Sequence, residues 1–242
     1  MKKTVFFALC VLLYGLSGCM KNDNNIEYYS YIPALIGGTI SQPLLVTSEA
    51  SLYAPDLQKH LLSYDLVDGD VVLSWFEIDR DNQPNGDMLT ASNVMCAKME
   101  KVRAQRTSGG ASLSNDYHFR INNLSFYDAI FDNHLGNFLF IVFEHYAADE
   151  DDFVYEMTYE INENDPIPTV YVRAKKTGTG IVSSGNIEYL GAFDITWMVQ
   201  EMASQGVDSN KIQFNIKFKT GVDDDGNDVF TSWSKNPFVY PS

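Results

Sequence analysis

The chain has 242 residues, of which 45% are hydrophobic and 13% aromatic, so it holds enough apolar material for one large or two small domains. Its 17 basic residues against 32 acidic ones give a formal net charge of −15 at pH 7. A chain this acidic is repelled by the phosphate backbone, which excludes nucleic acid as an expected partner.

The first residues have the features of an export signal. Lys2 and Lys3 precede an apolar run, Val5–Leu16, which is shorter than the ~20 residues that a membrane-spanning helix needs. The run leads into Leu16-Ser17-Gly18-Cys19, a pattern that resembles the lipobox of bacterial lipoproteins. We expect residues 1–18 to be removed as a signal peptide. We also expect Cys19 to carry a lipid that anchors the protein to the membrane, which is therefore an expected partner.

The residues that follow Cys19 are polar, and we expect residues 19–27 to form a flexible tether. Lys21 with the nearby Asp23 resembles part of the surface-export signal of lipoproteins from Gram-negative anaerobes. The expected location is therefore the outer membrane, lipid-anchored and either periplasmic or surface-exposed, with the surface favoured.

The three cysteines of the chain determine whether a disulfide can stabilise the fold. Cys10 lies in the signal and Cys19 is used for the lipid, so Cys96 is the remaining thiol and no intramolecular disulfide can form after processing. Cys96 lies in an apolar stretch, which predicts a small buried core residue rather than a catalytic thiol.

Strands are predicted where apolar and polar residues alternate or where apolar residues run on without a break. In chain order these segments are Asp70–Ile78, Val94–Arg103, Phe138–Phe143, Phe153–Ile161 and Lys211–Lys219. In the last of them Ile212, Phe214, Ile216 and Phe218 share one face. Acidic loops at Ala147–Asp152 and Asp223–Asp228 are predicted to join strands as hairpins.

Helix is predicted in two places. Pro55–Tyr64 could form two turns, and Ile195–Gln205 is the stronger candidate, with Asp194 as its N-cap and Gly206 at its end. Between the strand-rich halves, Arg106–Ser112 is rich in Gly and Ser, which favours a linker. We therefore expect one domain over residues 28–108 and a second over residues 109–242.

This order of elements resembles the NigD-like lipoproteins. The residues that carry the resemblance are Asp68–Leu73, Asn93–Arg103, Phe119–Asn123, Thr169–Arg173 and Gly191–Ile195. The resemblance implies an all-β fold with an N-terminal OB-like barrel, closed by Asn93–Arg103, followed by a C-terminal β-sandwich. It implies no catalytic residues, and bacteriocin immunity is the role suggested for one member of that family.

The sequence also resembles fimbrillin-type pilus subunits, so the alternative function is that of a structural subunit of such a pilus. Those proteins are also lipoproteins with two β domains and an arginine cleavage site, for which Arg103 and Arg106 are available. A strand-donor segment is not recognisable in this sequence.

The residues that most often carry catalysis or bind metals show no diagnostic spacing. The four histidines, His60, His118, His134 and His145, form no close pair, and the acidic clusters lack the oxygen spacing of a calcium loop. No nucleophile elbow or phosphate-binding loop is present. We expect no enzyme, no cofactor and no metal site.

Aromatic residues are the remaining candidates for binding. Tyr28, Tyr29, Tyr31 and Trp233 could offer flat faces to a partner, although aromatic side chains also pack strand interiors. The expected function is a non-enzymatic binding or accessory lipoprotein at the outer membrane that recognises a protein partner or a glycan.

Overall fold

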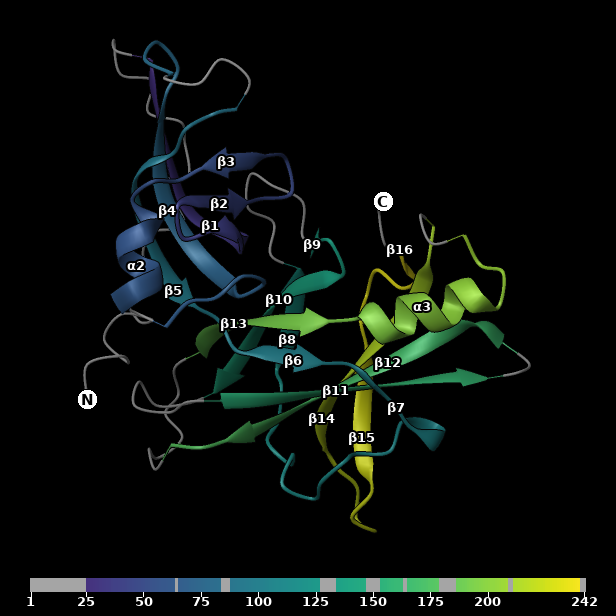
Figure 1. The fold of residues 1–242 in the computed structure, drawn as a ribbon. Coiled ribbons are helices and arrows are strands. Elements are labelled where there is room, and N and C mark those ends of the chain that lie inside the picture. The colour runs from purple at the N-terminus through teal and green to yellow at the C-terminus, as the bar shows by residue number, and fades with distance from the viewer. Residues whose placement is uncertain are drawn as a thin grey trace. The chain divides into compact units, whose positions relative to one another are not determined.

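The computed structural model describes residues 25–63, 65–83, 88–126, 134–146, 153–162, 165–178, 186–208 and 211–239. The predicted signal peptide, Cys19 and most of the predicted tether lie outside these residues. The described chain is all-β, as predicted, and forms two compact units (Figure 1). The N-terminal unit comprises the described residues up to Glu100 together with 134–136, and the C-terminal unit comprises 101–126 and those from Asn137 onward.

One five-stranded antiparallel sheet forms the N-terminal unit. Its elements are β1 (Ile26–Thr39), β2 (Gln42–Val46), β3 (Ser51–Tyr53), α2 (Leu57–Ser63), β4 (Val71–Asp79) and β5 (Ser92–Lys98). The strand order is β3-β2-β1-β4-β5. Two backbone hydrogen bonds, Tyr53 N to Leu89 O (2.9 Å) and Ala91 N to Tyr53 O (2.8 Å), join the end of β3 to the segment before β5.

The alternation in β4 determines which face of this sheet is its core. Val72, Phe76 and Ile78 pack in the core of the N-terminal unit. Residues of β1, β2 and α2 complete that core, among them Ile32, Ala34, Ile36, Leu45 and Leu57. The side chains at odd positions of β4 therefore lie on the opposite face of the sheet.

The C-terminal unit contains two sheets. Its elements are β6 (Lys101–Arg103), β7 (Gln105–Arg106), the 3₁₀ turn Ser108–Gly110, β8 (Asn123–Phe126), β10 (Phe138–Tyr146), β11 (Phe153–Asn162), β12 (Asp165–Lys176), β13 (Asn186–Asp194), α3 (Thr196–Ser204), β14 (Gln213–Val222), β15 (Asp228–Ser232) and β16 (Phe238–Val239); β9 (His134–Leu135) groups with the N-terminal unit. The strand orders are β6-β13-β10-β8 and β15-β14-β12-β11-β7, with β16 paired to β14.

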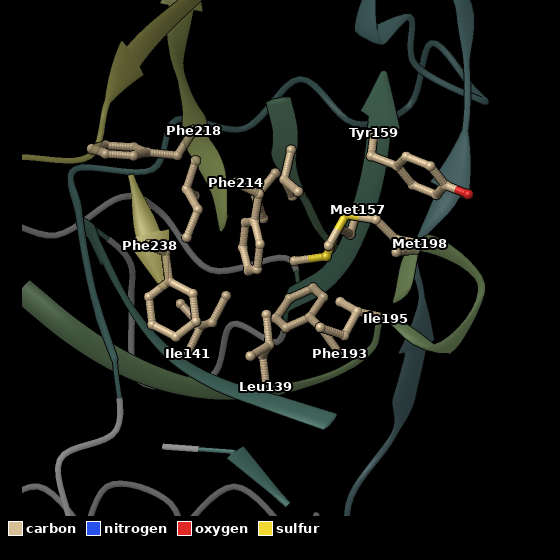
Figure 2. Packing of buried hydrophobic residues seen from close by; sticks show 14 of the residues in the cluster. Leu139, Ile141, Met157, Tyr159, Phe193, Ile195, Met198, Phe214, Phe218 and Phe238 are labelled. Carbon is tan, nitrogen blue, oxygen red and sulfur yellow. The ribbon is translucent and has the colours of Figure 1, made fainter. Parts of the chain in front are cut away.

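Side chains from both sheets build one apolar core (Figure 2). Leu139 and Phe193 come from the first sheet, and Met157 and Phe214 come from the second. The four apolar residues of Lys211–Lys219 that are predicted to share one face are all in this core. The unbroken apolar run of β10 is buried on both faces, as its sequence predicted.

Several local predictions were wrong, and one concerns Val94–Arg103. This segment is not a single strand that closes a barrel, because β5 ends at Lys98 and β6 begins at Lys101 in the other unit. Period-2 alternation reports which way side chains face, and it does not report a change of partner strand. The contacts thus divide the chain between Glu100 and Lys101, earlier than residue 108, and β1 begins at Ile26, within the predicted tether.

Two connections also differ from expectation. Loop Ala147–Asp152 lies outside the described residues, and the strands on either side of it, β10 and β11, belong to different sheets. The N-cap of α3 is Ile195, and Asp194 instead accepts a hydrogen bond from Thr196 N through Oδ1 (2.9 Å). The hairpin between β14 and β15 is confirmed, with Gly226 at φ +84°.

Candidate functional site

Aromatic and methionine side chains gather on the face of the N-terminal sheet that points away from its core. Trp75 lies on this face, since its neighbours Ser74 and Phe76 are buried on the other. Tyr28 pairs with Glu77, and Met95 pairs with Trp75 across the ladder. Tyr28 is 42% exposed and Met95 is 58% exposed. We call Tyr28, Tyr31, Trp75 and Met95 the outer aromatic face.

A β-bulge in β1 positions Tyr31 on this face. The register shifts between Tyr29 and Ile32, so Ser30 and Tyr31 together stand opposite Trp75. Tyr31 adopts φ +60°, a left-handed conformation that is strained for a bulky side chain. Its ring contacts Trp75 edge-on, with centroids 4.9 Å apart and planes at 69°. Bulges often redirect a side chain next to a functional site, and this one brings two aromatic rings together.

Tyr29 faces the core side of the same sheet. Its ring stacks on Phe76 at 4.8 Å, and its hydroxyl donates to Glu27 Oε2 (2.7 Å). Arg80 donates to the same carboxylate oxygen through Nη2 (2.9 Å). Burial, together with the bond to Glu27, raises the pKa of Tyr29 to about 12. Tyr29 therefore anchors the start of β1, and of the three predicted tyrosines only Tyr28 and Tyr31 share the outer face.

Trp233 lies in the C-terminal unit, whereas Tyr28, Tyr29 and Tyr31 lie in the N-terminal unit. Its ring packs against Phe126 (4.9 Å between centroids) and Phe238 (6.1 Å) at the margin of the core. Trp75 and Met95 take its place beside Tyr28 and Tyr31. The odd-numbered parity of β4 could have indicated Trp75, but no sequence signal indicates that Met95 pairs with it.

The buried histidine of the C-terminal unit has a structural environment. His145 Nδ1 lies 3.0 Å from Arg120 O, and Nε2 lies 3.0 Å from the hydroxyl of Tyr155. The neutral tautomer with the proton on Nδ1 satisfies both contacts. The ring also stacks on Phe153 at 4.1 Å. Burial lowers the pKa of His145 to about 4, so the ring stays neutral near pH 7.

Cys96 is partly buried against the core of the N-terminal unit, and burial raises the pKa of its thiol to about 12. Among the residues that the structure describes, no three His, Cys, Asp or Glu side chains are grouped as metal ligands would be. No helix in that part of the chain is long and apolar enough to cross a membrane.

A buried cluster of charged side chains was not expected from the sequence. The strand alternation placed Glu156 and Lys219 opposite the apolar faces of their strands, yet these two side chains and that of Arg173 are each no more than 3% exposed. Arg173 Nε donates to Asp228 Oδ2 (2.9 Å), and its Nη1 donates to Thr158 Oγ1 (3.0 Å). Two cations and two carboxylates thus offset one another on the outer side of the second sheet.

The segment 107–119, which we call the strap, covers this cluster. Thr107 N bonds Tyr159 O and Phe119 N bonds Ala174 O, both at 2.9 Å, so the strap crosses from β11 to β12. Arg173 Nη2 donates to Gly110 O. Glu156 accepts bonds from the side chain of Ser112 (2.7 Å) and from the backbone N–H of the next residue (2.8 Å). The predicted Gly/Ser linker is therefore part of the folded C-terminal unit.

Solved structures with the same architecture cover nearly the whole chain. A protein of uncharacterised function from Parabacteroides merdae is 12% identical over 84% of this chain and 95% of its own, with a TM-score of 0.61. A protein from Bacteroides fragilis, described provisionally as a lipoprotein, is 10% identical over 86% and 96%, with a TM-score of 0.54. No family model matches the chain, and no curated protein matches it.

A third structure is that of a NigD-like immunity protein from Bacteroides caccae, 11% identical over 91% of this chain and 98% of its own, with a TM-score of 0.51. The chain shares the fold of a NigD-like protein. The resemblance read from the sequence is thereby confirmed at the level of the fold. These neighbours are described as uncharacterised, lipoprotein or immunity proteins, and none is described as an enzyme.

Proposed function

We propose that this chain is a lipid-anchored envelope protein that binds a protein partner through its outer aromatic face, without catalysis. The signal peptide would be removed before Cys19, the lipid on Cys19 would hold the protein on the outer membrane, and residues 20–25 would act as the tether. In this proposal the N-terminal unit is OB-like, because the backbone hydrogen bonds of Tyr53 connect the edge strand β3 to the segment that precedes the other edge strand, β5. The C-terminal unit is a β-sandwich in the same proposal.

The observation that carries the proposal is the strained Tyr31 at the bulge. A left-handed conformation costs a non-glycine residue about 1–2 kcal/mol, and glycine would avoid that cost. The strain here places a half-buried ring against Trp75 on an otherwise regular strand. Strain that persists in a folded protein is concentrated at sites of function, which favours a role for this ring in recognition.

The chemistry of the face favours a protein over a glycan. Aromatic and methionine side chains are enriched in protein interfaces, and methionine adapts its shape to a partner. The likeness in fold to a protein described as a NigD-like immunity protein is consistent with a binding role.

Capture of the partner in cells tests this proposal. A photoreactive amino acid at position 95 is expected to cross-link a defined protein, and one at position 62 is the control. Met95 and Leu62 are both exposed apolar residues of the N-terminal unit, at 58% and 73%, and only Met95 is on the outer aromatic face. Equal cross-linking from both positions, or none from position 95, would refute the docking face.

The anchor needs a separate test. Replacing Cys19 with Ala is expected to release the protein from membranes into the soluble fraction. A Cys19→Ala protein that still sediments with membranes would refute lipid anchoring, whatever the result at position 95.

A further inference from the structure

Helix α3 holds one large aromatic ring at the surface of the C-terminal unit. Trp197 is 52% exposed, whereas Met198 and Met202 of the same helix are buried. The Arg103 guanidinium lies over the indole, with Cζ 4.8 Å from the ring centroid, and its Nε is 3.7 Å from Asp194 Oδ2. The ring is thus held in place by a cation–π contact while about half of its surface stays open to a ligand.

One turn further along the helix, Glu201 holds a second arginine. Residues four apart lie on the same side of a helix, so Glu201 and Trp197 are neighbours on α3. Glu201 Oε1 pairs with Arg106 Nη1, and Oε2 accepts a bond from the Tyr159 hydroxyl (2.9 Å). Figure 2 shows Tyr159 at the margin of the apolar core with its hydroxyl turned outward. Arg106 is anchored by these contacts, yet its side chain is 57% exposed.

Arg106 also lines an open pocket of about 600 Å³, which is within the ~300–1,000 Å³ typical of small-ligand sites. The other lining residues are Thr107, Ser108, Gly109, Glu160, Ile161 and Asn162. Most of them present hydroxyl, amide, carboxylate or backbone groups. Trp197, Arg103, Glu201, Arg106 and this pocket form a track that lies within one unit, and we call it the Trp197 track.

The charges along the track determine which ligands it suits. Arg103 faces Asp194, and Arg106 faces Glu201, so each guanidinium is offset by a carboxylate. Glu160 in the pocket adds a further negative charge, and it accepts a bond from the Tyr171 hydroxyl (2.6 Å). No positive excess remains to hold a phosphate, sulfate or carboxylate group, and the net charge of −15 opposes anions in general.

We propose that the Trp197 track binds a neutral saccharide. The apolar C–H face of a pyranose ring stacks on the open surface of Trp197. Neighbouring sugar hydroxyls bond to the planar side chains of Arg106, Glu160 and Asn162, which can donate or accept two bonds side by side. A peptide would need apolar anchor pockets, and Ile161 is the one apolar residue that lines this cavity.

The proposal is independent of the protein-binding face, because it rests on a different unit and a different ligand. The test uses the full native chain, extracted in a detergent without a sugar headgroup. Short neutral oligosaccharides of glucose, xylose, mannose, galactose and N-acetylglucosamine are titrated while tryptophan fluorescence and calorimetric heats are recorded. Uronic, sulfated and unstructured acidic-peptide probes are titrated in parallel.

At least one neutral oligosaccharide is expected to bind. Because Trp197→Ala removes the stacking surface, it is expected to weaken that binding about tenfold or more, and Trp197→Phe, which keeps an aromatic ring, much less. Arg106→Gln is expected to weaken it as well, and Leu62→Ala on α2 is the surface control that leaves it unchanged. An unchanged far-ultraviolet circular dichroism spectrum and an unchanged thermal midpoint of the Trp197→Phe variant verify that the fold is intact.

Three results would overturn the proposal. If no neutral oligosaccharide binds at millimolar concentration, the ligand is not a neutral saccharide. If Trp197→Ala leaves the binding unchanged, the saccharide does not bind at the Trp197 track. Binding confined to the uronic, sulfated or peptide probes refutes the argument from charge.

Discussion

Removing the buried arginine of the strap cluster is expected to destabilise the C-terminal unit strongly. Arg173→Met keeps most of the side-chain volume but takes away the donors that reach Gly110 O, Thr158 Oγ1 and Asp228 Oδ2. Glu156 then stays buried without its cation. The strap also loses one of the side chains that bind its backbone from beneath, while Glu156 and Lys219 still bind Leu113 N and Tyr117 O.

The expected loss follows from what remains after the substitution. Breaking a buried ion pair by removing one partner costs about 3–5 kcal/mol. Glu156 keeps its bonds from Ser112 Oγ and Leu113 N, and Asp228 keeps Lys219 as a partner. We therefore expect a loss near the lower limit, about 3 kcal/mol of unfolding free energy.

Lys175→Met is the matched control, since Lys175 lies two residues further along β12 and also pairs with the strap. Its Nζ is 2.9 Å from Asp116 Oδ2, but both side chains are exposed, at 38% and 63%. An exposed pair contributes about 0–1 kcal/mol. Arg173 and Lys175 thus differ in burial and in the number of their partners, so the comparison isolates the contribution of the buried cluster.

Urea unfolding measures the free energies, and hydrogen exchange at the Leu113 and Phe119 amides reports on the strap directly. Arg173→Met is expected to speed exchange at both amides, whereas Lys175→Met is expected to leave them nearly as protected as in the parent. If the two variants lose equal stability, or if the strap amides stay protected without Arg173, the account of the buried cluster is wrong.

Three further predictions follow from single positions. Gly110→Ala should cost about 1–3 kcal/mol, because its Cβ would lie 2.3 Å from the Tyr171 ring, and Gly109→Ala, with open space around it, should cost less in thermal melts. The folded pKa of His145, about 4, lies below the unfolded value of about 6.5, so its contribution to stability is present above pH 6.5 and lost towards pH 4. Urea midpoints should therefore fall less steeply with acidification in His145→Gln. Iodoacetamide at pH 8 should label Cys96 only after unfolding, as mass spectrometry can show.

The strands were predictable wherever one face of a sheet packs on a core. In β14 the alternation of apolar and polar residues coincides with the core that the structure shows. The same rule failed on the other face of that sheet, where Lys219 is 3% exposed. A charged residue on the face opposite the core is expected to be exposed to solvent, and only the tertiary structure shows that another segment covers it.

The candidate binding face was predictable in part. Tyr28 and Tyr31 were recognised as a cluster of aromatic residues, but strict alternation places Tyr29 and Tyr31 on one face and Tyr28 on the other. The bulge at Ser30 and Tyr31 reverses this, because it inserts one residue and moves Tyr31 to the side of Tyr28. No turn residue or glycine signals such a bulge in the sequence.

The Gly/Ser segment shows that the same composition is compatible with a flexible linker and with a segment packed closely against a sheet. Small residues leave a flexible linker when nothing lies beneath them, but they also let a backbone lie close against a sheet. Here the added methyl group of an alanine at Gly110 would strike Tyr171, and Gly110 O accepts a bond from Arg173. A buried guanidinium needs acceptors that side chains on its own strands do not fully supply, and a closely approaching backbone provides one. The close approach of Gly110 therefore provides an acceptor for Arg173, and Arg173 in turn holds the strap backbone in place. A prediction from composition alone would treat the strap as a linker, although the fold of the C-terminal unit requires it.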